Sequence, residues 1–182
     1  MNYIFSAIFL YFFLGFLLYI FQRRIVFNKS GHPGAPKDYN LDNTEEVYIK
    51  TEDNLKLLSW YHKGNNSLPL IVYFHGNSFH IGDRAYRIQR YIEKNWSVLL
   101  VSWRGFGGNK GNPTEKNLYK DAEAVLKWIK NNTEFKFKEL VIYGESLGSG
   151  AAVEMGTKYE FLSIVLEAPF TSINDIAKKR YK

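Results

Sequence analysis

The sequence predicts an α/β fold: a mostly parallel β-sheet with helices on both faces, preceded by one transmembrane helix. Short continuous apolar runs alternate with segments of helical periodicity, which is the pattern of βα units whose strands are buried on both faces. Two strand-like segments, 46–50 and 56–61, flank Asp53-Asn54 and predict an antiparallel N-terminal hairpin at one edge of the sheet. An uncharged apolar stretch precedes all of these elements.

The apolar stretch, residues 3–21, is rich in Phe, Leu, Ile and Tyr. At about 1.5 Å per residue, a helix of this length approaches the ~30 Å hydrocarbon core of a bilayer. A cleaved signal peptide is the competing interpretation, but Met1-Asn2 lacks a basic side chain and Gln22-Arg23-Arg24 stands where small residues should be. A buried soluble helix would rarely be apolar on every face. We therefore predict an uncleaved membrane anchor over residues 1–24.

The charges around this anchor predict its orientation. Arg23, Arg24 and Lys29 all follow the apolar stretch, so the positive-inside rule places the rest of this single-pass chain on the cytoplasmic side. Residues 25–43 carry two glycines and two prolines and indicate a connector, so we expect the folded domain over 44–182.

Beyond the hairpin, the elements follow one another as the fold class requires. Continuous apolar runs predict strands at 70–74, 97–102, 140–143 and 163–167. Two amphipathic helices lie between them, one with Ile81, Ala85, Ile88 and Ile92 on one face, the other beginning at the N-cap Thr114 and carrying Leu118, Ala122, Val125 and Ile129. A third helix follows the strand at 140–143.

Composition limits the function classes. The chain has 182 residues, 46% of them hydrophobic, and no cysteine, which excludes disulfides and thiolate metal sites. The net charge of +6 is scattered except at Lys178-Lys179-Arg180 and Lys182, a cluster that is either a solvated tail or a segment attracted to anionic lipid. Since a basic stripe with a recognition motif is missing, we expect no nucleic-acid partner.

The heptapeptide Gly144-Glu145-Ser146-Leu147-Gly148-Ser149-Gly150 carries the chemistry. It lies between a strand and a helix, and a strand, a Gly-x-Ser-x-Gly turn and a helix form a nucleophile elbow. Gly144 and Gly148 are needed because the backbone bends too sharply for a Cβ on either side. Ser146 would then project at the carboxyl end of the strand. The alternative is that Ser146 merely caps the helix.

Other motifs stand in a fixed order around the elbow. They are His75-Gly76-Asn77, Trp103-Arg104-Gly105-Phe106-Gly107-Gly108, and Glu167-Ala168-Pro169-Phe170-Thr171-Ser172. In this combination, from about Phe21 to the end, the chain resembles the α/β-hydrolase superfamily, and within it the membrane-anchored serine hydrolases of the Bem46-like group (the α/β-hydrolase-domain-13 and -17 type). The resemblance implies hydrolysis of an ester, thioester or amide through an acyl-enzyme.

The resemblance also assigns roles to residues. Ser146 would be the nucleophile, and the backbone N–H groups of Leu147 and Asn77 would form the oxyanion hole. His75 would be a structural residue or a base, and Arg104 would tie its loop in place or contact substrate. The glycines after Arg104 lack the Lys-Ser/Thr of a phosphate loop, and we expect neither a cofactor nor a metal ion.

The acid and base of a catalytic triad are missing. In this fold the acid and then the histidine follow the serine, yet all four histidines (His32, His62, His75 and His80) precede Ser146. The family does not use the position of Glu167 as its acid, and Asp175 lies before the next strand would begin. We therefore expect a fold that is incomplete at its C-terminus, with Ser163–Glu167 as a bare apolar edge strand.

Two functional hypotheses follow. The chain is either a membrane-anchored serine hydrolase whose acid and base come from a complementing C-terminal fragment or from residues beyond this sequence, or a catalytically inactive remnant that acts, if at all, as a membrane-bound binding scaffold. For the hydrolase, the partners would be the bilayer, through residues 3–21, and an acyl-containing small molecule, lipid or protein.

Overall fold

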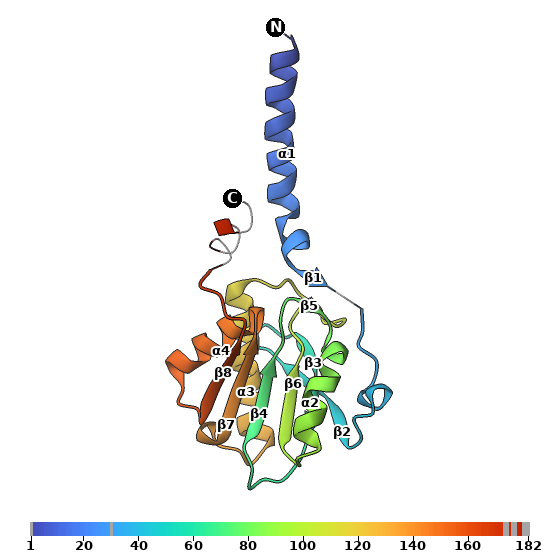
Figure 1. Ribbon diagram of the computed structural model, residues 1–182, viewed down its shortest axis with the longest axis vertical. Helices are drawn as coiled ribbons and strands as arrows, with labels where there is room; N and C mark the ends of the chain where they lie inside the picture. The colour runs from blue at the N-terminus through green and yellow to red at the C-terminus, as the bar shows by residue number, and fades with distance from the viewer. Residues whose placement is uncertain (1, 30, 173–174, 176–177, 180–182) are drawn as a thin grey trace.

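A long helix stands on an α/β domain in the computed structural model, which describes residues 2–29, 31–172, 175 and 178–179 (Figure 1). The elements are α1 (Asn2–Val26), β1 (Asn28–Lys29), η1 (Pro36–Tyr39), β2 (Thr44–Lys50), β3 (Lys56–His62), β4 (Leu70–Phe74), β5 (Ser78–Phe79), η2 (Ile81–Arg84), α2 (Ala85–Ile92), β6 (Ser97–Val101), α3 (Glu115–Asn132), η3 (Phe137–Glu139), β7 (Leu140–Glu145), α4 (Leu147–Lys158) and β8 (Ser163–Glu167).

The central sheet has six strands in the order β2-β3-β6-β4-β7-β8. The β2–β3 hairpin occupies one edge, and β3 also runs antiparallel to β6, whereas β6, β4, β7 and β8 are mutually parallel. The predicted mostly parallel sheet with an antiparallel N-terminal hairpin is thus confirmed. Phe74 pairs with both Val101 and Gly144, so the carboxyl ends of β4, β6 and β7 lie side by side.

Helices cover both faces of this sheet, as predicted. In β4, Leu70, Val72 and Phe74 pack in a core with residues of α3 and α4, whereas the alternating residues Ile71 and Tyr73 pack in a second core with residues of α2. The predicted apolar stripes are buried at Ile81, Ala85, Ile88, Leu118, Ala122, Val125 and Ile129, while Ile92 is partly buried. The Thr114 hydroxyl accepts a hydrogen bond from the Asn117 N–H (3.2 Å), which confirms the predicted N-cap.

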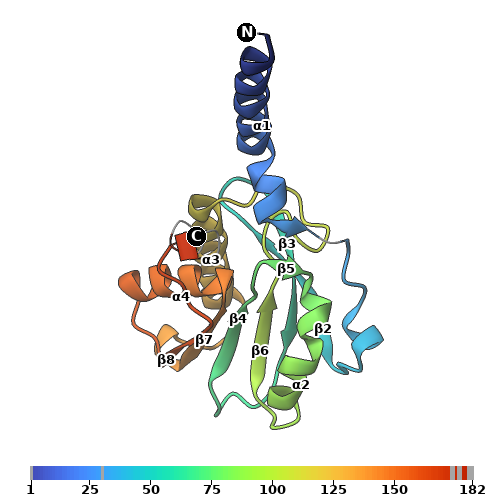
Figure 2. The ribbon, with the colours of Figure 1, turned by 45° about the horizontal axis from the view of Figure 1, so that its top comes forward.

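The helix α1 leaves the domain at the carboxyl end of the parallel strands (Figures 1 and 2). Residues Tyr3–Gln22 have a mean hydropathy of 2.4 and none of the apolar residues in this span is buried inside the structure, so by length and composition this helix could cross a membrane. Immediately after it, β1 pairs in parallel with β5, Asn28 opposite Ser78 and Lys29 opposite Phe79. Phe27, 9% exposed, joins the core and packs edge-on against Phe106.

The other edge of the sheet is apolar and open in the described part of the chain. Ile164, Val165 and Leu166 of β8 are 38–39% exposed, and β7 is the neighbour on one side. The predicted apolar edge strand is therefore confirmed. In the basic tail, Lys178 and Lys179 are exposed, whereas Arg180 and Lys182 lie outside the described residues.

Arg104 ties the loop after β6 to two other parts of the fold. Its guanidinium donates to Asp121 of α3 at 2.6 and 2.8 Å, and to Asp53 in the β2–β3 turn at 2.7 and 3.1 Å. Arg104 is 2% exposed and Asp121 is fully buried, so the charges compensate one another where water is excluded. The expectation that Arg104 holds its loop in place is confirmed.

The start of α4 approaches β4 closely enough to exclude a side chain. A Cβ on Gly148 would lie 2.0 Å from the carbonyl oxygen of Phe74 and 2.6 Å from its carbonyl carbon. Backbone atoms of a central strand cannot move away without disturbing the sheet. Gly150, two residues later in α4, has no atom within 4 Å of the position a Cβ would take.

These two glycines provide a matched test of the packing. Gly148→Ala should destabilise the protein by about 3 kcal/mol, because the methyl group would overlap the backbone of β4. Gly150→Ala should be neutral or stabilise it by about 0.5–1 kcal/mol, since alanine is the better helix former. Thermal unfolding of both variants in detergent micelles measures the difference, and equal stabilities would contradict the close packing at Gly148.

The Asp53–Arg104 contact should make stability depend on pH. Hydrogen bonds from Arg104 hold the pKa of the Asp53 carboxyl well below its usual range. A lowered folded-state pKa stabilises the fold above the ordinary carboxyl pKa, and this contribution is lost as the pH falls below about 4. Asp53→Asn should therefore cost about 1 kcal/mol at pH 7, because the carboxylate is partly exposed, and the cost should shrink toward pH 2–3. Unfolding midpoints between pH 7 and pH 2.5 test this, with the exposed Asp42→Asn as the control; a pH-independent cost would contradict it.

Candidate active site

Ser146 lies at a sharp bend between β7 and α4. Its backbone has φ 47° and ψ −108°, a conformation that non-glycine residues rarely adopt. The bend is held by hydrogen bonds on both sides: the Ser146 N–H donates to the Glu167 carbonyl (2.8 Å), and the Ser146 carbonyl accepts from the N–H (2.8 Å) and the hydroxyl (2.5 Å) of Ser149. The Ser146 side chain makes no cap hydrogen bond, so the alternative of a simple helix cap is not supported.

The two glycines of the motif are required for space. A Cβ on Gly144 would lie 2.7 Å from the Cα of Ser149 and 2.9 Å from the Cβ of Ala152. Gly148 contacts β4, as described above. Ser146, and neither glycine, adopts the unusual backbone angles. Gly144 and Gly148 therefore provide the space for the strand–turn–helix bend, and the backbone strain lies at Ser146.

The two predicted oxyanion donors lie on neighbouring segments, one at the start of α4 and one in the loop after β4. Leu147 is the first residue of α4, where a backbone N–H precedes the first intrahelical hydrogen bond. Asn77 lies between β4 and β5, and the residue before it, Gly76, packs against the elbow: a Cβ there would lie 3.0 Å from Glu145 Oε1 and 3.4 Å from the Glu145 carbonyl oxygen. The fold therefore brings the loop of Asn77 to the elbow, and the role of both N–H groups stays a prediction.

Glu145, the residue before the serine, is fixed by a buried arginine. The Arg84 guanidinium, 7% exposed, donates to both carboxylate oxygens of Glu145 at 2.9 and 3.1 Å, and to the Ser78 carbonyl at 2.6 Å. The Tyr73 hydroxyl adds a third hydrogen bond to Glu145, at 3.0 Å. Burial alone would raise the pKa of Glu145, but the hydrogen bonds from Arg84 outweigh it and the pKa is lowered. Sequence reasoning missed Arg84, because nothing in the sequence links it to a partner 61 positions away.

Glu167 is held in a second ion pair beside the first. Its Oε2 accepts hydrogen bonds from the Arg87 guanidinium (2.5 Å) and from the Tyr143 hydroxyl (2.7 Å). Burial and the hydrogen bond to Glu167 raise the pKa of Tyr143 to about 12. The ring of Tyr143 stacks on Tyr73, with centroids 4.6 Å apart, and so joins the two ion pairs into one polar cluster between α2 and the sheet. This engagement agrees with the expectation that Glu167 is no triad acid.

His75 is built into the core. It is fully buried, its Nδ1 lies 2.6 Å from the Gly76 carbonyl oxygen, and its Nε2 accepts a 3.5 Å hydrogen bond from the Trp103 N–H. Burial, together with the nearby Arg84, lowers the pKa of the imidazole to about 4, so the ring is neutral at pH 7. Both ring nitrogens contact backbone atoms, which supports the structural role and leaves neither of them for Ser146.

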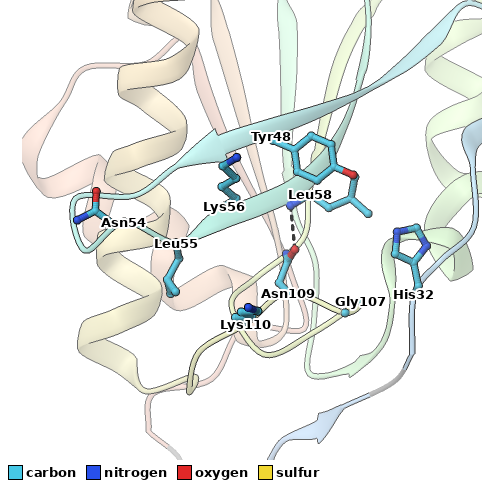
Figure 3. A pocket seen from close by; sticks show the side chains of 10 residues that line it. His32, Tyr48, Asn54, Leu55, Lys56, Leu58, Gly107, Asn109 and Lys110 are labelled. Carbon is cyan, nitrogen blue, oxygen red and sulfur yellow. Dashed lines mark hydrogen bonds between the residues drawn. The ribbon is translucent and has the colours of Figure 1, made fainter.

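The other three histidines lie elsewhere. His62 is buried in β3, 3.3 Å from the Thr44 hydroxyl, and His80 Nδ1 lies 2.9 Å from Asp83 Oδ2. His32 lines a hollow of about 390 Å³ between the β2–β3 turn and the glycine-rich loop after β6, together with Tyr48, Lys56 and Lys110 (Figure 3). The Asn109 side chain pins that loop by accepting a hydrogen bond from the Leu58 N–H (2.9 Å), drawn dashed in Figure 3. Among the described residues, no cluster of three or more His, Asp or Glu could hold a metal ion.

The chain is similar to known proteins over most of its length. The chain is 30% identical to the Bem46 protein of Schizosaccharomyces pombe over 90% of this chain and 58% of that protein. It is 29% identical to the lysophosphatidylserine lipase ABHD12 of Danio rerio over 79% of this chain and 44% of that protein. The chain therefore spans 44–58% of the length of these two relatives.

Solved structures of α/β-hydrolases share this fold. The Pyrococcus furiosus esterase Pf2001 superposes with a TM-score of 0.71 at 26% identity, over 85% of this chain and 63% of that one. The model of the family described as serine aminopeptidase, S33, matches residues 66–181, more than half of the sequence and all of the elbow. A six-stranded mixed sheet, a strained serine between β7 and α4 and this match together place the chain in the serine aminopeptidase S33 family of α/β-hydrolases.

Proposed function

We propose that this chain is the N-terminal part of a membrane-anchored serine hydrolase, which cleaves an ester, thioester or amide through an acyl-enzyme on Ser146. The observation that supports this most strongly is the backbone of Ser146, at φ 47° and ψ −108°. Strain of this kind costs about 1–3 kcal/mol and persists only where the surroundings impose it, as Gly144 and Gly148 do here. In a nucleophile elbow, this bend exposes the serine hydroxyl at the carboxyl ends of the strands.

The oxyanion hole of the proposed enzyme consists of the N–H groups of Leu147 and Asn77. Each donor of this kind contributes about 3–4 kcal/mol to the stabilisation of a tetrahedral intermediate. The Arg84–Glu145 ion pair fixes both loops, since Glu145 packs against Gly76 and Arg84 binds the Ser78 carbonyl. The esterase and lipase named above support an ester or lipid substrate.

The acid and the base of the proposed triad lie outside this sequence, in the same protein or in a complementing fragment. A serine hydroxyl needs a neighbouring base, and His75, the histidine nearest in sequence to the oxyanion loop, is engaged by backbone atoms. In this fold the missing groups follow further strands, and the open apolar edge of β8 is where such strands add.

In the same proposal, α1 anchors the protein and the domain lies on the cytoplasmic side. Protease added to intact cells should leave the domain uncut, whereas permeabilised cells should lose it. Digestion from outside would contradict the proposed sidedness and leave the hydrolase assignment untouched.

A second candidate function is a catalytically inactive, membrane-bound scaffold. It is favoured by one observation: all four histidines precede Ser146, and the contacts of His62, His75 and His80 described above are with other residues. Without a base, such a site retains only about 10³–10⁴-fold acceleration over water.

Fluorophosphonate labelling of native membranes separates the two candidates. We expect the chain to be labelled at Ser146, because a histidine from the remainder of the protein or from a complementing fragment activates it. Ser146→Ala should abolish labelling, whereas Ser67→Ala, an exposed serine in the loop before β4, should leave it unchanged. Absence of labelling in a folded, membrane-bound chain would favour the scaffold.

A further inference from the structure

We propose that the pairing of β1 with β5, which attaches the end of α1 to the loop after β4, turns the candidate site toward the bilayer, so that the substrate is an acyl lipid taken from the membrane. The substrate and the membrane anchor in this proposal rest on the proposed function, whereas the attachment of β1 to β5 stands on the fold alone. This attachment determines whether the acyl group reaches Ser146 from the bilayer or from the aqueous solution.

The connection between the anchor and the domain is short. The helix α1 ends at Val26, β1 begins at Asn28, and Phe27 between them is 9% exposed in the core against Phe106. The apolar span ends at Gln22, so four helical residues, about 6 Å at 1.5 Å each, separate it from Phe27. The headgroup layer on each side of a bilayer is about 5–8 Å thick, which places β1 at its outer boundary.

The loop to which β1 is attached leads directly to the candidate site. Pairing of Asn28 with Ser78 and of Lys29 with Phe79 fixes β5, which begins one residue after Asn77. Gly76, on the other side of Asn77, packs against Glu145 next to the serine. The anchor is therefore connected through one short loop to the backbone that carries the candidate oxyanion donor and the nucleophile.

Phe79 gives an independent indication of a membrane-facing surface. Its side chain is 53% exposed, and its backbone has φ 61°, which is an outlier for a bulky residue. The backbone of Phe79 pairs with Lys29, just after the anchor, and an exposed Phe side chain at this point is of the kind that inserts into the membrane interface in peripheral proteins. Figures 1 and 2 show β5 and α1 at the same end of the domain.

The chemical consequence concerns which acyl groups are concentrated at this end. The ester carbonyls of lipids lie at the boundary between headgroups and hydrocarbon, within reach of a site held at the membrane surface. A rigid attachment maintains the local concentration of these groups, whereas a soluble acyl ester gains nothing from it. The inferred substrate class is thus the long-chain acyl lipid.

The chain contains no cysteine, which permits a test that needs no catalysis. We compare Ser146→Cys with Ser67→Cys, an exposed position at the opposite end of β4, in the full chain reconstituted into phosphatidylcholine vesicles. Each variant is alkylated by N-hexadecyl iodoacetamide dissolved in the bilayer and by iodoacetamide in water. We expect the ratio of bilayer to aqueous rate to be at least tenfold higher at position 146 than at position 67.

A linker variant controls for the attachment itself. Twelve Gly/Ser residues inserted between Val26 and Phe27 leave β1 and Phe27 in place but release the domain by about 20 Å. The ratio at position 146 should then fall to that at position 67. Equal ratios at the two positions without the linker, a ratio unaffected by the linker, or no reaction of the Ser146→Cys variant with either reagent would each overturn the inference.

The test is separate from that of the proposed function. If the lipid reagent prefers the thiol of the Ser146→Cys variant but fluorophosphonate never labels Ser146, the orientation stands and the hydrolase proposal fails. If labelling at Ser146 occurs but the two ratios are equal, the hydrolase proposal stands and the membrane-derived substrate fails.

Discussion

The close contact between the start of α4 and the backbone of β4 is the constraint on which the site depends. Gly148 lies against the Phe74 carbonyl, and Gly144 lies against Ser149 and Ala152. With the strand before it and the helix after it both fixed, the one residue left to absorb the change in direction is Ser146. The strained backbone angles of Ser146 thus result from the close packing of α4 on the sheet.

Ion pairs connect the segments at the carboxyl end of the sheet. The pairs Arg84–Glu145 and Arg104–Asp121 are largely buried, whereas Arg87 and Glu167 are 31% and 36% exposed. Arg84 binds Glu145, Arg87 binds Glu167 and Arg104 binds Asp121, and each pair joins a residue of a loop or strand end to a residue from another element. Buried ion pairs add little net stability compared with apolar packing, but breaking one leaves an uncompensated charge. Their contribution here is to fix the loops at the carboxyl end of the sheet relative to one another.

The sequence predicted the sheet, its hairpin edge, the helices on both faces and the family, because these depend on periodicity, turn chemistry and short motifs that act locally. Thr114 as an N-cap and Arg104 as a tie between segments are examples confirmed by contacts. The partners of Arg84 and Arg87 could not be predicted, since a long-range ion pair leaves no pattern in a single sequence. The same holds for the β1–β5 pairing, which two residues on each side form without any strand-like sequence.

One hydrogen bond connects the edge strand β8 to the backbone of the candidate nucleophile. The Ser146 N–H donates to the carbonyl of Glu167, the last residue of β8. Edge strands open locally at a lower free energy than central ones, and each opening of β8 would release this N–H and relax the bend. The order of the nucleophile therefore depends on an edge strand of the sheet, and a chain that pairs with β8 would also order the backbone of Ser146 from a distance.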